Sequence, residues 1–129
     1  MKTISTLLIC SLFFSCNFKK TLEKIDTINS DLRTTFNHQD ITTGISMGTN
    51  EGSNNVIVSF YNFNLDSLSI SDLTNLASRV ELRVCEKNSS FKKLDYIEVR
   101  FTKQEYPDNA SDLVSFKFED NALCNPNRR

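Results

Sequence analysis

The sequence predicts a small α+β domain in which a helix followed by two strands occurs twice. The chain has 129 residues, of which 39% are hydrophobic and 24% charged, and this suits one ordinary globular domain. Apolar residues recur at helical spacing in two segments. Each of these segments is followed by two stretches rich in β-branched and aromatic residues. The simplest packing is a four-stranded antiparallel sheet with two helices on one face.

The first predicted helix covers residues 19–38. Its apolar residues fall on one face of a helical wheel, whereas Lys24, Asp31 and Arg33 lie elsewhere. This face either packs on the core of the domain or contacts a partner or a lipid surface. Because the polar face mixes both signs of charge, we favour core packing. The apolar face consists of Leu22, Ile25, Ile28, Leu32 and Phe36.

Two strands are predicted next, over residues 41–47 and 56–65, with turn-forming residues between them. The pair is therefore interpreted as a hairpin. The second strand is apolar on both faces, which has two explanations. It is either a central strand covered on both sides, or it contributes to an exposed patch that docks a partner. The patch would contain Tyr61, Phe63 and Tyr96, since tyrosine is common at interfaces.

The second helix-strand-strand unit begins at a predicted capping box, with Ser69 as the N-cap and Asp72 reaching back to it. Residues 94–103 alternate apolar with polar side chains and predict a half-buried strand. A turn over residues 105–109 precedes the last strand, residues 114–118. The helical stripe of this unit consists of Leu73, Leu76, Ala77, Val80 and Val84.

The N-terminal residues have the pattern of a secretion signal. Lys2 gives a positive start, and an apolar run from Ile4 to Phe14 follows. The run is about half of the roughly 20 apolar residues that span a bilayer, which is the length of a signal-peptide core. It ends in the sequence LFFSC, where a small residue comes directly before Cys16.

This ending resembles a bacterial lipobox, in the relaxed, phenylalanine-tolerant form of Bacteroidota-type lipoproteins. Phe13 stands where the usual motif prefers leucine. The resemblance covers the first 16 residues of the chain. It implies that residues 1–15 are a signal peptide that is removed and that the thiol of Cys16 receives a lipid. Residues 16–20 would then form a lipidated tether, and residues 21–129 a single domain. The alternatives are secretion without a lipid, or an uncleaved short anchor.

The resemblance also implies a location. An acylated Cys16 would hold the protein on a membrane, because two or three acyl chains give stable anchoring. Residues 17–20 carry neither the acidic residue that retains lipoproteins at the inner membrane nor an acidic run that marks surface export. We therefore expect the protein in the cell envelope, on the outer membrane and facing the periplasm, with the lipid bilayer as a partner.

The four cysteines have separate roles under this interpretation. Cys10 leaves with the signal peptide and Cys16 carries the lipid. Cys85 and Cys124 remain as an even pair in an oxidising compartment, and a disulfide between them is predicted. Two buried free thiols are the alternative. The predicted topology supports the bond, because the second helix ends where the third strand begins and an antiparallel fourth strand ends beside that point.

The sequence carries few residues arranged for catalysis. It has no GxSxG, P-loop or HExxH motif, and its one histidine, His38, cannot form a multi-histidine metal site. We expect no cofactor and no metal. The near balance of 15 basic and 16 acidic residues argues against nucleic-acid binding. Carboxylate pairs can cleave glycans, and the nearest candidates are Glu81 with Glu98 and Asp108 with Asp112.

Two classes of function follow from these observations. The first is a non-enzymatic binding or interaction module held at the membrane, such as an accessory subunit, an inhibitor of a periplasmic enzyme or an immunity protein. The sequence does not specify its envelope partner. The second is a small carboxylate-dependent enzyme or binder that acts on peptidoglycan or glycans. Removal of 15 residues from the 129 leaves 114, which is little for a substrate cleft, so we favour the first class.

Overall fold

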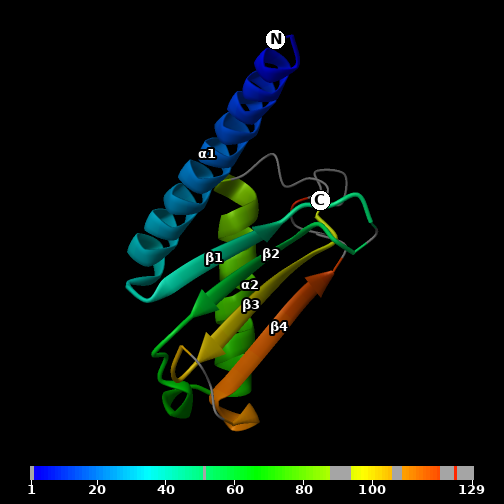
Figure 1. Cartoon of the computed structure of the whole chain (residues 1–129). Coiled ribbons are helices and arrows are strands. Elements are labelled where there is room, and N and C mark those ends of the chain that lie inside the picture. The colour runs from blue at the N-terminus through cyan, green and yellow to red at the C-terminus, as the bar shows by residue number, and fades with distance from the viewer. Residues whose placement is uncertain (1, 51, 88–93, 106–108, 120–123, 125–129) are drawn as a thin grey trace.

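The structure, a computed structural model, describes residues 2–50, 52–87, 94–105, 109–119 and 124, and for residues 2–17 it describes the backbone alone. The order helix, strand, strand, helix, strand, strand is confirmed, and the fold is α+β (Figure 1). The elements are α1 (Lys2–Phe36), β1 (Ile41–Ser46), β2 (Asn55–Phe60), the short 3-10 helix η1 (Leu65–Ser67), α2 (Ile70–Lys87), β3 (Tyr96–Thr102), the short 3-10 helix η3 (Ala110–Asp112) and β4 (Leu113–Glu119).

The four strands form one sheet in the order β1-β2-β3-β4. β1 pairs with β2 and β3 pairs with β4 in antiparallel fashion, as predicted. The central strands β2 and β3 are parallel, so the sheet is mixed and mostly antiparallel rather than purely antiparallel. The reason is the crossover helix α2, which returns the chain to the end of the sheet where β2 began. A tight turn cannot make that connection.

Both helices pack on one face of the sheet. α2 crosses behind the strands in Figure 1, and α1 lies beside it against β1. The core between these layers contains side chains such as Val58, Phe60 and Phe101, each at most 1% exposed. Arg83 of α2 donates two hydrogen bonds to the carboxylate of Asp31 of α1, at 2.7 and 2.5 Å, and this ion pair joins the two helices.

Local hydrogen bonds set the C-terminal end of α1 and the N-terminal end of α2. α1 ends where Asn37 takes the left-handed conformation, with φ of 50°. The N–H of His38 donates to the carbonyl oxygen of Arg33 at 3.2 Å, as in a Schellman motif. At the start of α2 the N–H of Asp72 donates to Oγ of Ser69 at 3.1 Å, and the N–H of Ser69 donates to the Asp72 carboxylate at 3.2 Å. The predicted capping box is confirmed.

β2 is shorter than the strand predicted over residues 56–65. It ends at Phe60, and Asn62 has a φ of 51°, in the left-handed region. This turn carries the chain back towards the core. The ring centroid of Phe63 lies 6.0 Å from that of Phe60 and 4.9 Å from that of Phe101. Phe63 is therefore partly buried and packs against the core, because the strand does not continue past Phe60.

Cys85 and Cys124 lie at disulfide distance, with their Cα atoms 4.9 Å apart. The prediction that these two cysteines are neighbours is confirmed by this distance. β4 runs antiparallel to β3, as the predicted neighbourhood of the two cysteines requires. The two cysteines are 39 residues apart in the sequence, and both β3 and β4 lie between them. The link therefore joins the end of α2 to the segment that follows the last strand.

Candidate functional surface

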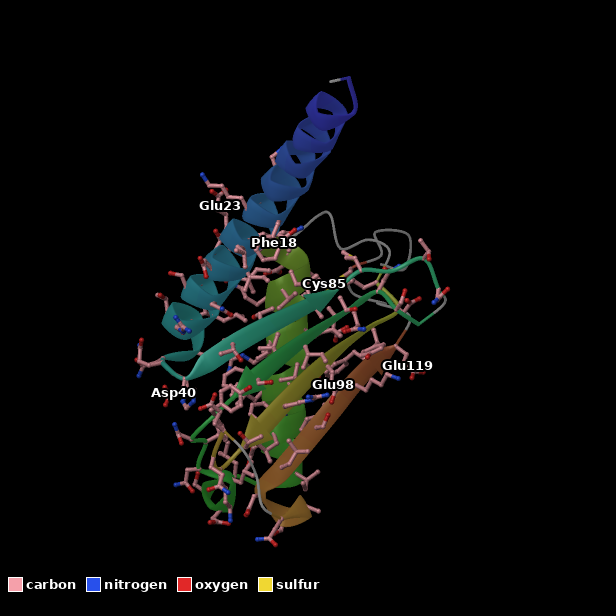
Figure 2. All side chains as sticks on the ribbon, in the orientation of Figure 1. Phe18, Glu23, Asp40, Cys85, Glu98 and Glu119 are labelled. Carbon is pink, nitrogen blue, oxygen red and sulfur yellow. A yellow bond between two sulfur atoms is a disulfide. The ribbon has the colours of Figure 1, made fainter. Side chains whose placement is uncertain are left out.

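The start of α1 stands clear of the rest of the domain (Figures 1 and 2). Residues 2–15 of the expected signal peptide and the expected tether over residues 16–20, which begins at Cys16, all lie within this one helix. The tether is therefore helical rather than extended. Phe18 and Leu22 are 67% and 45% exposed, whereas Ile28 is 3% exposed. The side chains of Phe18 and Leu22 thus lie before the point where α1 meets the core.

The turns of α1 from Ile28 to its end pack on the core. Ile28 and Leu32 are buried, and Leu32 is 1% exposed. The ring of Phe36 packs edge-to-face on that of Phe60, with centroids 6.1 Å apart. Core packing, the interpretation favoured from sequence, is confirmed for this part of the helix. The apolar face of α1 therefore has two environments, one buried and one exposed.

The sheet face opposite the helices forms a second candidate surface, which we call the open face. At its centre Glu98 accepts two hydrogen bonds from Arg100, at 2.7 and 3.1 Å, and one from Oγ of Ser115 at 2.6 Å. The hydrogen bond from Arg100 is the main reason why the pKa of the Glu98 carboxyl lies below its ordinary value. Strand alternation gives the open face Thr42, Gly44, Ile57, Ser59, Tyr96, Glu98, Arg100, Ser115 and Lys117, with Tyr61 just beyond the end of β2.

The structure does not gather the three residues of the predicted patch. Tyr61 and Tyr96 share the open face, but Phe63 is partly buried and packs against the core. The parallel register places Tyr96 beside Asn55, six residues before Tyr61. The two tyrosines are therefore separated by about 20 Å along the strands. Arg100 lies between them.

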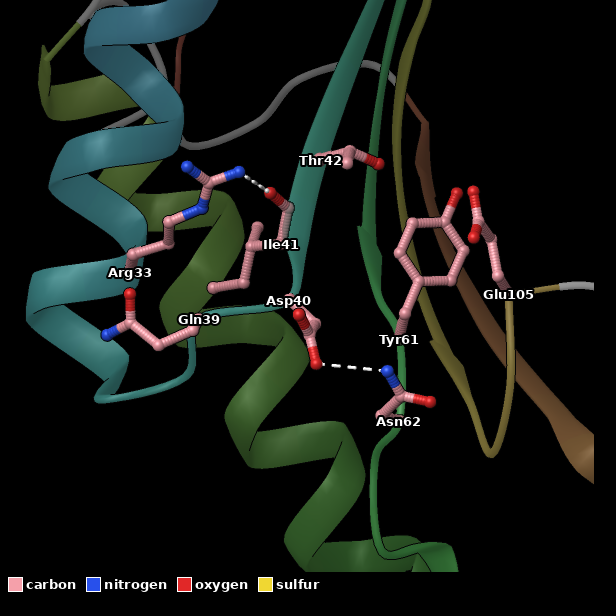
Figure 3. Close-up of a pocket in the computed structure, with 8 residues that line it drawn as sticks. All are labelled: Arg33, Gln39, Asp40, Ile41, Thr42, Tyr61, Asn62 and Glu105. Atoms are coloured by element: carbon pink, nitrogen blue, oxygen red, sulfur yellow. Dashed lines mark hydrogen bonds between the residues drawn. The ribbon is translucent and has the colours of Figure 1, made fainter.

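A shallow pocket of about 210 Å³ lies at the start of β1, and Tyr61 is one of the residues that line it (Figure 3). Nη2 of Arg33 donates to the carbonyl oxygen of Ile41 at 2.8 Å, and the amide of Asn62 donates to the carboxylate of Asp40 at 3.0 Å. Arg33 thus covers a backbone carbonyl on the outer edge of β1, which is an edge strand. This arrangement protects the edge from pairing with another chain.

The candidate catalytic carboxylates are not brought together. Glu81 lies on α2, on the helix-covered side of the sheet, and is 4% exposed. Glu98 is on the open face, so the sheet separates the two. In the second pair, Asp112 lies 3.8 Å from Nζ of Lys103. Asp108, the other member of this pair, lies outside the described residues.

His38 is packed as a structural residue. Its Nε2 lies 2.7 Å from the carbonyl oxygen of Tyr61. Its ring centroid is 5.6 Å from that of Phe60 and 5.5 Å from that of Phe63. Within the described part of the chain, no three side chains of His, Cys, Asp or Glu are grouped as metal ligands.

Glu81 gives the stability of the protein a pH dependence. Burial raises the pKa of its carboxyl above the ordinary value, because the charged form is disfavoured there. Below the unfolded-state pKa the carboxyl is neutral in both states. As the pH rises towards the raised folded-state pKa, the unfolded chain loses its proton first, and stability falls. Glu81→Gln should therefore raise the free energy of unfolding at pH 8, and should raise it much less near pH 4.

Urea denaturation at the two pH values measures this difference. Glu23→Gln is the control, because the Glu23 side chain on α1 is 65% exposed and should show no such gain. An equal gain for Glu81→Gln at both pH values would assign its effect to packing rather than to ionisation.

Two residues of these surfaces, Phe18 and Arg100, were not predicted from the sequence. Phe18 lies four positions before Leu22, so extension of the apolar face by one turn would have found it. Arg100 lies two positions after Glu98 in an alternating strand, which places both side chains on one face. The spacing of these two charged residues was the signal in the sequence that they form a pair on one face of the sheet.

Comparisons with family models, curated proteins and solved structures find no match to this chain. Across the described residues, no helix has the length and apolar character needed to cross a bilayer.

Proposed function

We propose that the chain is a lipid-anchored, non-enzymatic interaction module of the bacterial cell envelope, held on the outer membrane and facing the periplasm. The exposed start of α1 carries this proposal. The lipobox-like sequence ends at Cys16, and the side chains of Phe18 and Leu22 that follow are exposed. A lipid on Cys16 would therefore be attached at the projecting end of the helix, away from the core.

A protein partner docks on the open face in this proposal. Tyr61 and Tyr96 supply stiff, amphipathic contact area, and the guanidinium of Arg100 between them is held in position by Glu98. Tyrosine and arginine side chains supply much of the binding energy at many protein interfaces. Accessory-subunit, inhibitor and immunity roles all agree with such a surface, and the identity of the partner distinguishes them.

The alternative of a glycan-cleaving enzyme gains no support from the described residues. Glu81 and Glu98 lie on opposite sides of the sheet, and a single substrate does not reach both. The other candidate pair is Asp108 with Asp112, and Asp108 is outside the described residues.

The anchor is tested by labelling cells that express the tagged full chain with a fatty-acid probe. The wild-type protein should be labelled and should sediment with membranes, and Cys16→Ala should lose all labelling. Cys10→Ala is the matched control, because it removes a nearby cysteine and leaves the lipobox unchanged, so it should be labelled like the wild type. Labelling that persists in Cys16→Ala contradicts the proposal.

The docking surface is tested by cross-linking in intact cells followed by mass spectrometry. The wild-type protein should capture one dominant protein in stoichiometric amount, and the variant with Tyr61→Ala and Tyr96→Ala should lose it. Ile70→Ala is the control, because Ile70 is 65% exposed and lies at the start of α2, outside the open face. Capture of the same protein by the double variant, or enrichment of glycan fragments with no protein, would count against the interaction module.

A further inference from the structure

The apolar face of α1 extends beyond the core that it helps to form. Phe18, Leu22, Ile25 and Leu32 are spaced at intervals of three, four and seven positions, so they share one side of the helix. A helix rises 1.5 Å per residue, which puts Phe18 about 15 Å before Ile28, the first buried residue among those described. Phe18 and Leu22 are thus large apolar side chains, one turn apart, that remain exposed on the part of α1 before the first buried residue.

The position of these side chains along the chain indicates what covers them. Phe18 follows two residues after Cys16, the proposed site of the lipid, and α1 passes through both positions without a break. Phe18 and Leu22 therefore lie about 3 and 9 Å from Cys16 along the helix axis. Neither distance exceeds the depth of roughly 5–10 Å to which interfacial helices bury their apolar side chains.

The charged residues beside this pair agree with a lipid surface. Lys19 and Lys20 are exposed. Lys19 also lies 3.9 Å from the carboxylate of Glu23, but this ion pair is exposed and weak. Long lysine side chains can reach lipid phosphates while the neighbouring apolar side chains enter the interface.

We propose that Phe18 and Leu22 insert into the lipid interface as a second, non-covalent membrane contact that fixes the orientation of the domain. This inference rests on the proposed acylation of Cys16. An acyl chain alone allows the domain to rotate freely, whereas a continuous helix with two inserted side chains has a preferred direction. Figure 1 places η1 and η3 at the end of the molecule opposite the N-terminus, so these elements are held farthest from the bilayer.

A single introduced tryptophan tests the insertion, because the chain contains no tryptophan. The acylated Phe18→Trp protein is purified from cells and reconstituted into vesicles of phosphatidylethanolamine and phosphatidylglycerol. Its emission should shift to the blue, and brominated lipids should quench it. Ile70→Trp is the matched control, because Ile70 at the start of α2 is 65% exposed, against 67% for Phe18. Quenching of Phe18→Trp should exceed that of Ile70→Trp by about threefold or more.

The mass of each intact protein is measured on the same samples, so the two possible failures are distinguishable. If the acyl chains are present and both tryptophans have the same emission and quenching, the inference is overturned and the anchor stands. If the acyl chains are absent, the proposed function is overturned together with the inference that rests on it.

A second variant tests the orientation separately. Phe18→Ser and Leu22→Ser, introduced together with Ile70→Trp, should leave acylation unchanged and allow the domain to tilt towards the bilayer. Quenching at position 70 should then rise about twofold or more, since the tryptophan can now meet the lipid. Unchanged quenching at position 70 overturns the role of these side chains in orienting the domain.

Discussion

Phe60→Ala is expected to lower the free energy of unfolding by about 3–5 kcal/mol, as large-to-small changes of buried aromatic residues do. Phe60 is 1% exposed. Its ring centroid lies 5.0 Å from that of Phe101, 6.0 Å from that of Phe63 and 6.1 Å from that of Phe36. These neighbours come from α1, from β3 and from the segment after β2. No single element can move to fill the cavity, so most of the lost packing is not recovered.

Urea denaturation followed by circular dichroism measures this loss. Phe18→Ala is the matched control, because it makes the same change at a position that is 67% exposed. That variant should change the stability by less than about 0.5 kcal/mol. Equal losses in the two variants would show that Phe60 is not a packing centre of the domain.

Loss of the link between Cys85 and Cys124 is expected to reduce the stability by about 4 kcal/mol. The two residues are 39 positions apart, and in the chain-entropy model the closure of a loop of that length removes this much freedom from the unfolded chain. Oxidised wild-type protein and Cys124→Ser should differ by that amount in urea denaturation without a reductant.

A reductant provides the control for this prediction. It should lower the stability of the wild-type protein to that of Cys124→Ser, and it should leave the variant unchanged. If the reductant has no effect on the wild-type protein, the two cysteines are free thiols in the folded chain, and their short separation reflects packing alone.

The secondary structure could be predicted from the sequence where it depends on neighbouring residues. The capping box of Ser69 and Asp72 sets the start of α2 within four residues, and alternation over residues 94–103 identifies β3. Both patterns are local, and the hydrogen bonds or burial that they require are also local. The paired cysteines are not local, and they could be placed because the order of the elements and the antiparallel direction of β4 bring them to the same end of the sheet.

The direction of the central strand pair could not be predicted in this way. Whether β3 runs parallel or antiparallel to β2 depends on the end of the sheet to which α2 returns the chain, and no residue in either strand encodes that choice. The predicted patch failed to assemble for related reasons. The left-handed conformation of Asn62 ends the strand early and moves Phe63 to the core, and the register separates Tyr61 from Tyr96.

The exposure of Phe18 could not be predicted either, because it depends on how far along α1 the core extends. The spacing of apolar residues indicates which side of α1 faces inward. It does not indicate how far the sheet and α2 extend alongside the helix. That limit is set by the lengths of β1 and α2, so the exposed part of α1 is visible once the elements are assembled.

The parallel pairing of β2 with β3 also determines the order in which the chain can fold. β1 with β2, and β3 with β4, join segments that are close in the sequence, so their loops close at small entropic cost. The central pairing begins with Asn55 beside Tyr96, 41 positions later, and all of α2 lies between them. We therefore expect the two antiparallel pairs to form first and the centre of the sheet to close last, after α2 has docked. Until that step the inner edges of β2 and β3 are open to other chains, so the interval before closure is when aggregation competes most strongly with folding.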